Sequence, residues 1–216
     1  MTLIAFNFDE TLTQSDPSLL LGSEYDVATE VRGLVEQGLQ EETSFETSLR
    51  QRVKLLEGMP EQEVETAFDR LKLRDGAAEL LTDLQRSDVP VAIVTGSFER
   101  AVDAGLQNAG VAVDHVVANR LVVENGALTG EVEGALLEPE TDRALTELAT
   151  AEGVALEDTF AVGNGAIDLR MLQTAGTAIG YDPEPVAEQY CDVVVTSMRR
   201  LRLYFEQHGL IDSDAR

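Results

Sequence analysis

The chain has 216 residues, 44% of them hydrophobic, which suits one core domain with a modest insertion. Its 40 acidic residues face 16 lysines and arginines, and the formal net charge of −24 argues against nucleic acid or an anionic membrane as a partner. No apolar run approaches the roughly 20 residues that span a bilayer, and the N-terminus lacks a basic, signal-like lead, so we expect a cytoplasmic protein.

The first predicted element is a buried strand at 3–8, which leads into Asn7-Phe8-Asp9-Glu10-Thr11. Residues 14–75 then break the alternation of strands and helices that the rest of the chain follows, and their own pattern is helical. We therefore expect a helical cap at 14–75, inserted over the strand ends of a core domain made of residues 1–13 and 76–216.

Two helices of this cap have recognisable start signals. Thr43-Ser44-Phe45-Glu46 matches a capping box that opens a helix to residue 56. Pro60 stands near the first turn of the next helix, which carries Val64 and Phe68 on one face. The cap is therefore expected to have an apolar face of its own.

After the cap, apolar runs alternate with helical spacing, which is typical of a mostly parallel α/β sheet with helices on both faces. The helical spacing stops at Gly110 and at Gly153, which predicts crossover helices that end in glycine. Two runs around Glu124-Asn125-Gly126 predict a β-hairpin appended to the sheet. The predicted strands are 89–94, 159–162, 177–179 and 193–195, with hairpin runs at 116–123 and 128–132.

Polar clusters follow three of the predicted strands. Asn7 and Asp9 end the first, Thr95-Gly96-Ser97 follows the second, and Asn164 and Asp168 occupy a glycine turn after the third. Open parallel sheets bind ligands at the carboxyl ends of their strands, so these clusters predict one site. A hydroxyl group and the free N–H groups of a following helix would suit a phosphate there.

One arginine of the cap falls on an apolar helix face. Seven residues of helix turn through about 700°, so Arg52 returns to the face of Phe45 and shares it with Leu49 and Val53. From helix geometry alone, such an arginine extends its charge into water. A position above the strand ends favours a bidentate grip on a carboxylate instead.

Together these motifs resemble the phosphoserine phosphatases of the haloacid dehalogenase-like superfamily, over nearly the whole chain. The family pattern Asp-x-Asp-x-Thr matches residues 7–11, Gly-Asp-Gly-x-Asn-Asp matches 163–168, and 45–60 is similar to the family's cap helix. The resemblance implies a Rossmann-like core with a helical cap, hydrolysis of phosphoserine to serine and phosphate, and Mg²⁺ as the cofactor.

The resemblance also assigns roles to individual positions. Residue 7 would be the nucleophile and Asp9 the acid and base. Substrate contacts would come from Asp16, Phe45, Arg52, Thr95, Gly96 and Arg143. The metal would be held at Asn7, at the backbone carbonyl of Asp9 and at Asn164, with Asp168 behind them.

The chain departs from the family pattern at four positions of this site. A carboxamide oxygen is a poor nucleophile and offers Mg²⁺ no charge, so the standard aspartyl-phosphate mechanism is not possible and metal binding is expected to be weakened. The replaced residues are the nucleophilic Asp (now Asn7), a metal-ligand Asp (Asn164), an Asn (Ile167) and a phosphate-binding Lys, whose slot falls to Thr141 or Asp142 with Arg143 as the nearest cation.

Some of these residues also have simpler interpretations. Thr95 could serve merely as a strand-end hydroxyl that caps a helix. Asp16, which precedes Pro17, could simply be the residue that starts a helix. Arg143, in a first helical turn, is more often solvated than functional.

Two functional hypotheses therefore stand side by side. The first is a phosphomonoester hydrolase acting on phosphoserine with weak or lost turnover. The second is a non-catalytic protein that binds a phospho-amino acid or phosphate for sensing or regulation. The acidic residues are scattered and do not form one patch, which favours adaptation to high salt over a docking surface for a basic partner.

Overall fold

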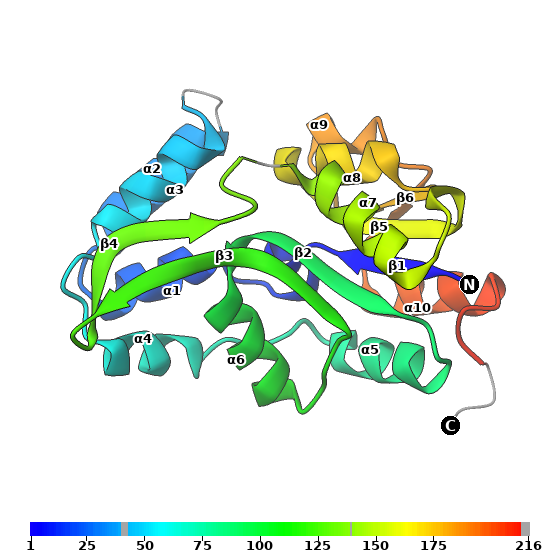
Figure 1. The fold of residues 1–216 in the computed structure, drawn as a ribbon, viewed down its shortest axis with the longest axis horizontal. Helices are drawn as coiled ribbons and strands as arrows, with labels where there is room; N and C mark the ends of the chain where they lie inside the picture. The colour runs from blue at the N-terminus through cyan, green and yellow to red at the C-terminus, as the bar shows by residue number, and fades with distance from the viewer. Residues whose placement is uncertain (40–42, 139, 213–216) are drawn as a thin grey trace.

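The computed structural model describes residues 1–39, 43–138 and 140–212. Residues 40–42 of the predicted cap, and 139 and 213–216 of the predicted core, lie outside the described residues. Within them, one sheet contains β1 (Leu3–Phe6), β2 (Val91–Phe98), β3 (His115–Glu124), β4 (Ala127–Gly134), β5 (Thr159–Gly163), β6 (Thr177–Tyr181) and β7 (Val193–Val195). Their order is β4-β3-β2-β1-β5-β6-β7, and each neighbouring pair is parallel except the antiparallel β3–β4 hairpin (Figure 1).

Helices cover both faces of this sheet, as predicted (Figure 1). On one face lie α7 (Thr141–Glu152), α8 (Leu169–Thr174) and α9 (Pro185–Glu188), and on the other lie α5 (Ala77–Arg86), α6 (Glu99–Ala109) and α10 (Met198–Gln207). Successive strand residues point to opposite faces, so Leu3 and Ala5 join the core beneath α7 and α8, whereas Ile4 and Phe6 join the larger core beneath α5, α6 and α10. The predicted α/β architecture is therefore confirmed.

The predicted chain reversals are also found. Gly110 follows α6 with φ 67°, and Gly153 follows α7 with φ 65°, the left-handed conformation in which glycine ends helices. Asn125 and Gly126 both have positive φ, 51° and 79°, as the tight turn of a two-residue hairpin requires. The hairpin forms one edge of the main sheet and continues it beyond β2.

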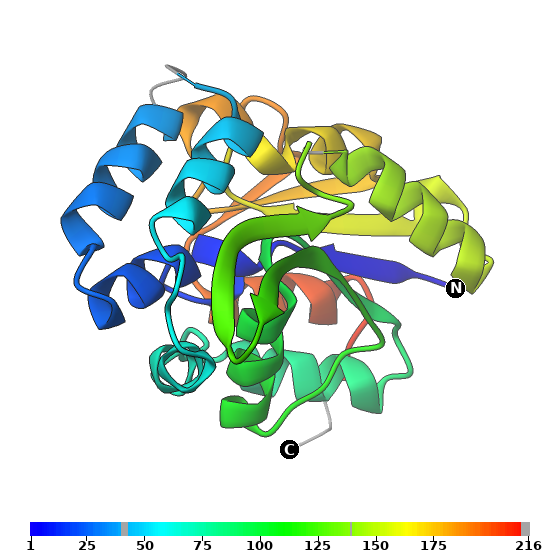
Figure 2. The same ribbon diagram turned by 60° about the vertical axis from the view of Figure 1, so that its left-hand side comes forward.

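A group of helices precedes α5 in the chain and lies beyond the end of the sheet toward which β1 runs (Figures 1 and 2). In the described residues it contains α1 (Pro17–Glu24), α2 (Ala28–Leu39), α3 (Phe45–Lys54) and α4 (Glu61–Phe68). The α2 and α3 helices lie side by side (Figure 2). The boundary of this group as a separate cap remains a prediction.

The predicted capping box at the start of α3 is wrong by one residue. Ser44 is the N-cap, and its hydroxyl accepts a hydrogen bond from the Thr47 N–H at 3.2 Å. This register puts Glu46 one position too early to complete the box, and its carboxylate instead pairs with Arg50 one turn later. The α3 helix also ends at Lys54, two residues before the predicted end.

Backbone hydrogen bonds tie the segment between α3 and α4 to the hairpin. The Gly58 N–H donates to the Leu128 carbonyl at 2.8 Å, and the Leu128 N–H donates to the Met59 carbonyl at 2.9 Å. A third bond of 2.9 Å joins the Glu61 N–H to the carbonyl of Gly126. The helix that carries Arg52 is thus anchored to the sheet at its C-terminal end.

No helix in the described part of the chain is both long enough and apolar enough to cross a membrane.

Candidate active site

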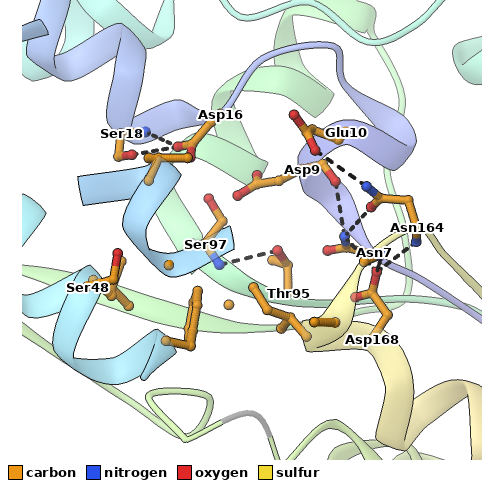
Figure 3. Close-up of a pocket in the computed structure, with 18 of the residues that line it drawn as sticks. Asn7, Asp9, Glu10, Asp16, Ser18, Ser48, Thr95, Ser97, Asn164 and Asp168 are labelled. Carbon is orange, nitrogen blue, oxygen red and sulfur yellow. Dashed lines mark hydrogen bonds between the residues drawn. The ribbon is translucent and has the colours of Figure 1, made fainter. Parts of the chain in front are cut away.

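A cavity of about 710 Å³ lies between the carboxyl ends of the central strands and the helices α1 to α3 (Figure 3). Most of the predicted site residues line it. From the core come Asn7, Asp9, Thr95, Gly96, Asn164 and Asp168, and from the helices above come Asp16, Phe45 and Arg52.

Asn7 stands directly after β1, where its own N–H donates to the Val162 carbonyl of β5 at 2.8 Å. Its side chain is buried, and Oδ1 accepts the Phe8 N–H at 2.7 Å. Nδ2 faces three oxygens: the Asp9 carbonyl at 3.0 Å, Asn164 Oδ1 at 3.2 Å and Asp168 Oδ2 at 3.2 Å (Figure 3). The position predicted for a nucleophile therefore holds a hydrogen-bond donor that joins two strand ends.

Asp168 is fully enclosed beneath this group. Its Oδ2 also accepts the N–H groups of Asn164 at 2.8 Å and Gly165 at 3.1 Å. Burial raises the pKa of Asp168 to about 6, and the hydrogen bonds from Asn164, Gly165 and Asn7 limit that rise. Thr11 Oγ1 donates to Asn164 Oδ1 at 3.0 Å, so the amide oxygen of Asn164 accepts bonds from two sides.

The Asp9 carboxyl group points into the cavity from a strained turn. Glu10, the next residue, has a φ of 57°, a left-handed conformation that costs a non-glycine residue about 1 kcal/mol. Burial, and next the charge of Asp16, raise the pKa of Asp9 well above its ordinary value. Asp9 Oδ1 has no hydrogen-bond partner among the described residues. The raised pKa favours the protonated form of the Asp9 carboxyl group.

Arg52 enters the cavity from α3. Its side chain is 8% exposed, and Nη1 contacts Asp16 Oδ2 at 3.1 Å and Ser18 Oγ at 3.0 Å. The guanidinium carbon lies 6.0 Å from the centre of the Phe45 ring. Asp16 also caps α1 by accepting the Ser18 N–H at 2.7 Å, so the simple helix-start interpretation of Asp16 holds alongside its position in the cavity.

Phe45 closes the cavity over Gly96. A Cβ atom at position 96 would come within 2.5 Å of the Phe45 ring, so only glycine allows this approach. The structure corrects the prediction for 95–97, because β2 continues to Phe98 and α6 begins at Glu99. These residues therefore lie on a strand and not in the first turn of a helix. Thr95 Oγ1 accepts the Ser97 N–H at 3.2 Å, a local turn contact within this segment.

Arg143 does not reach the cavity, which corrects its placement among the substrate contacts. Its side chain is 68% exposed and pairs with Glu147 on the same helix at 2.8 Å. Thr141 is the buried residue of this turn, and its hydroxyl donates to the Ile167 carbonyl at 3.3 Å. This exposed position agrees with the solvated interpretation of Arg143.

Sequence reasoning gave no role to several polar residues of the cavity. Ser18 could have been found, because an Asp N-cap bonds to the residues of the first helical turn. Glu184 carried no signal, since it enters from the loop before α9. The residues missed in this way include Glu10, Ser18, Ser48 and Glu184.

The side chains at the strand ends, in the arrangement that the structure shows, do not form a binding site for Mg²⁺. In the described part of the chain, no three His, Cys, Asp or Glu side chains form a group that could hold a metal ion. Magnesium needs oxygen ligands at about 2.1 Å. Here the oxygens of Asp9, Asn164 and Asp168 converge on an N–H donor instead.

The fold and the cavity define a Rossmann-like α/β protein whose site lies at the carboxyl ends of its central strands, beneath a set of helices. A family model described as haloacid dehalogenase-like hydrolase matches residues 4–173, and the chain belongs to this family.

Several relatives are phosphoserine phosphatases. One from Halobacterium salinarum is 42% identical over 97% of this chain and 100% of its own length. One from Methanocaldococcus jannaschii is 37% identical over 89% of this chain and 91% of its own. A solved phosphoserine phosphatase complex with bound substrate has a TM-score of 0.87 at 36% identity, covering 94% of this chain and 97% of that one. A solved structure described as a phospho-aspartyl intermediate analogue of phosphoserine phosphatase also has a TM-score of 0.87, at 35% identity, covering 94% of this chain and 98% of that one.

Proposed function

We propose that this chain is a phosphoserine-directed member of the family, which binds phosphoserine in the cavity and hydrolyses it weakly or not at all. The observation that carries the proposal is the cavity itself, because it joins Arg52 and Phe45 to the strand ends that carry Asn7 and Asp9. Phosphoserine presents a carboxylate at one end and a phosphate at the other. Arg52 suits the carboxylate, and the strand ends suit the phosphate.

Loss of turnover follows from two side chains. The Asn7 carboxamide cannot form an aspartyl-phosphate, and its Oδ1 already accepts a backbone N–H. Burial and the charge of Asp16 raise the pKa of Asp9, which favours its protonated form and suits it to donate a proton to a leaving oxygen. The same proton removes the base that direct attack by water would need.

A non-catalytic binding protein is the second candidate. The arrangement of Asn7 favours it, because the amide serves the structure of the site through its bonds to Asn164 and Asp168. In that case the cavity senses phosphoserine or a similar phospho-amino acid.

Phosphate release and equilibrium binding of phosphoserine, measured in the same high-salt buffer with magnesium, test the proposal. We expect saturable binding with little or no release, while the Halobacterium salinarum phosphatase serves as the active control. Rapid release by this chain would contradict the loss of turnover. Absence of binding would contradict phosphoserine as the ligand.

A further inference from the structure

The orientation of the Asn7 amide is fixed by its neighbours. Nδ2 faces the carbonyl of Asp9 and the carboxylate of Asp168, neither of which can donate a hydrogen bond while Asp168 is ionised. Oδ1 faces the Phe8 N–H, which cannot accept one. Turning the amide over would place an oxygen against acceptors and a donor against a donor. The nitrogen of the Asn7 amide therefore points toward these oxygens, and its oxygen points toward the Phe8 N–H.

This one nitrogen joins chain segments that are far apart in sequence. Asp9 belongs to the turn after β1, whereas Asn164 and Asp168 follow β5, more than 150 residues later. Around a divalent cation, oxygens from such strand ends would be drawn together by its charge. Here the Nδ2 atom of Asn7 lies 3.0 to 3.2 Å from the three oxygens and shares its two hydrogens among them, and the bond to Asp168 is assisted by the negative charge of that carboxylate.

We infer that the Asn7 carboxamide takes the place of a divalent cation as the group that holds the ends of β1 and β5 together. The stability of this protein is therefore independent of magnesium. A second consequence, which rests on the proposed function, is that phosphoserine binding is independent of magnesium as well.

The charge of the site agrees with this inference. A cation with two positive charges would need at least one further carboxylate at bonding distance, and both candidate positions are amides, Asn7 and Asn164. The carboxylate of Asp168 accepts hydrogen bonds from Asn7, Asn164 and Gly165 at Oδ2, whereas its buried Oδ1 has no partner among the described residues. The N–H groups of Asn7 provide positive electrostatic potential to the surrounding oxygens without adding a full positive charge.

Thermal unfolding of the parent protein and of two single variants tests the inference without any phospho-ligand. Asn7→Asp replaces the inward donor by an oxygen, so acceptors then face one another across the group. Asn164→Asp adds the same charge to the same site but keeps an acceptor for the Asn7 amide and for Thr11. Each protein is measured in chelator and in excess magnesium, at a matched ionic strength of potassium chloride.

We expect the Tm of the parent in chelator to equal its Tm in magnesium. The Tm of Asn164→Asp in chelator should stay above that of Asn7→Asp, because the inward donor of Asn7 is kept. The Tm of Asn7→Asp should be the lowest of the three in chelator and should rise by several degrees in magnesium. A parent Tm that rises with magnesium as much as that of Asn7→Asp would overturn the inference. Equal Tm values for Asn7→Asp and Asn164→Asp in chelator would do the same.

A calorimetric titration keeps the inference testable if Asn7→Asp does not fold. Magnesium added to the parent should give no saturable heat, and stoichiometric binding would overturn the inference. Phosphoserine titrations of the parent form a separate arm. Failure of phosphoserine to bind would count against the proposed function alone, whereas binding only in the presence of magnesium would count against the inference.

Discussion

Among the described residues that line the cavity, Arg52 is the only lysine or arginine. Under the proposed function, recognition of an anionic ligand therefore depends on Arg52. Its position is set from two helices, because α3 carries it and the start of α1 supplies Asp16 and Ser18 as partners. A guanidinium held in this way loses little conformational freedom on binding a ligand. Arg52 is therefore prepared to meet a carboxylate.

Arg52→Ala should weaken phosphoserine binding strongly and inorganic phosphate binding little. Removal of one partner from a buried, charged pair costs about 2 to 5 kcal/mol. Calorimetric Kd values for both ligands measure the difference. Arg50→Ala, on the same helix with a side chain that is 49% exposed, is the matched control and should bind phosphoserine as the parent does. Equal losses for both ligands would contradict a carboxylate-binding role.

Asn7→Asp alone should restore little hydrolysis, whereas Asn7→Asp combined with Asn164→Asp should restore much more. The first change returns the attacking carboxylate, and the second returns charge at the neighbouring strand end, where the two side chains already touch. The effects of substitutions on activity are strongly non-additive when the substituted residues share one site. Magnesium titrations of phosphoserine hydrolysis for the parent, both single variants and the double variant decide the matter. Additive gains would show that the two positions act separately.

At the residue scale, the sequence placed the strand-end residues correctly because each follows an apolar run at a fixed spacing. It misplaced Arg143, which lies two positions after Thr141 and hence about 200° around the helix, on the face opposite the buried one. The orientation of the Asn7 amide was not predictable either. It depends on Asn164 and Asp168, which only the folded chain brings near.

At the element scale, α3 matters most because it positions both Phe45 and Arg52. Four N–H groups at the start of any helix lack partners within it, and Ser44 supplies an acceptor for one of them. The loss of this cap would loosen the first turn, where Phe45 is the first residue.

Ser44→Ala should lower the free energy of unfolding by about 1 kcal/mol, the usual value of an N-cap side chain. Urea unfolding measures this loss, with Ser44→Asp as the control, because aspartate caps as well as serine does. Phosphoserine binding should change less than in Arg52→Ala. Unchanged stability for Ser44→Ala would show that contacts with neighbouring helices alone hold the start of α3.

At the element scale, the sequence predicted the presence of strands better than it predicted where they end. Buried strands such as β1 and β5 are continuous apolar runs, so they were located within two residues. The sequence did not predict the polar continuation of β2 through Thr95-Gly96-Ser97, because these residues carry no apolar pattern. They lie where the register with β3 shifts, between Val94 and Phe98. Local signals also could not choose between Thr43 and Ser44 as the cap of α3.

At the scale of the whole molecule, the net charge of −24 dominates. Many of the arginine pairs lie at the surface, as between Arg120 and Glu133, whose side chains are 63% and 58% exposed. Exposed pairs of this kind contribute little stability. The excess of acidic side chains therefore repels itself across the folded surface, and dissolved salt would screen this repulsion.

The Tm should rise from dilute buffer to molar potassium chloride. Screening lowers the repulsion in the compact folded state more than in the expanded unfolded state. A thermal unfolding series in potassium chloride measures the effect, and sucrose, which is excluded from protein surfaces without screening charge, is the control. A Tm that stays constant across the salt series would contradict adaptation to high salt.

The backbone bonds between the α3–α4 segment and the hairpin have a consequence for the route of ligand exchange. Swinging α3 away from the sheet at this end would break bonds at Gly58, Met59 and Glu61 together. Rotation of the Phe45 ring away from Gly96 breaks none of these bonds, so the ring can open the cavity without releasing the helix. A ligand that leaves past this ring would therefore exchange while the hydrogen bonds between the α3–α4 segment and the hairpin stay intact.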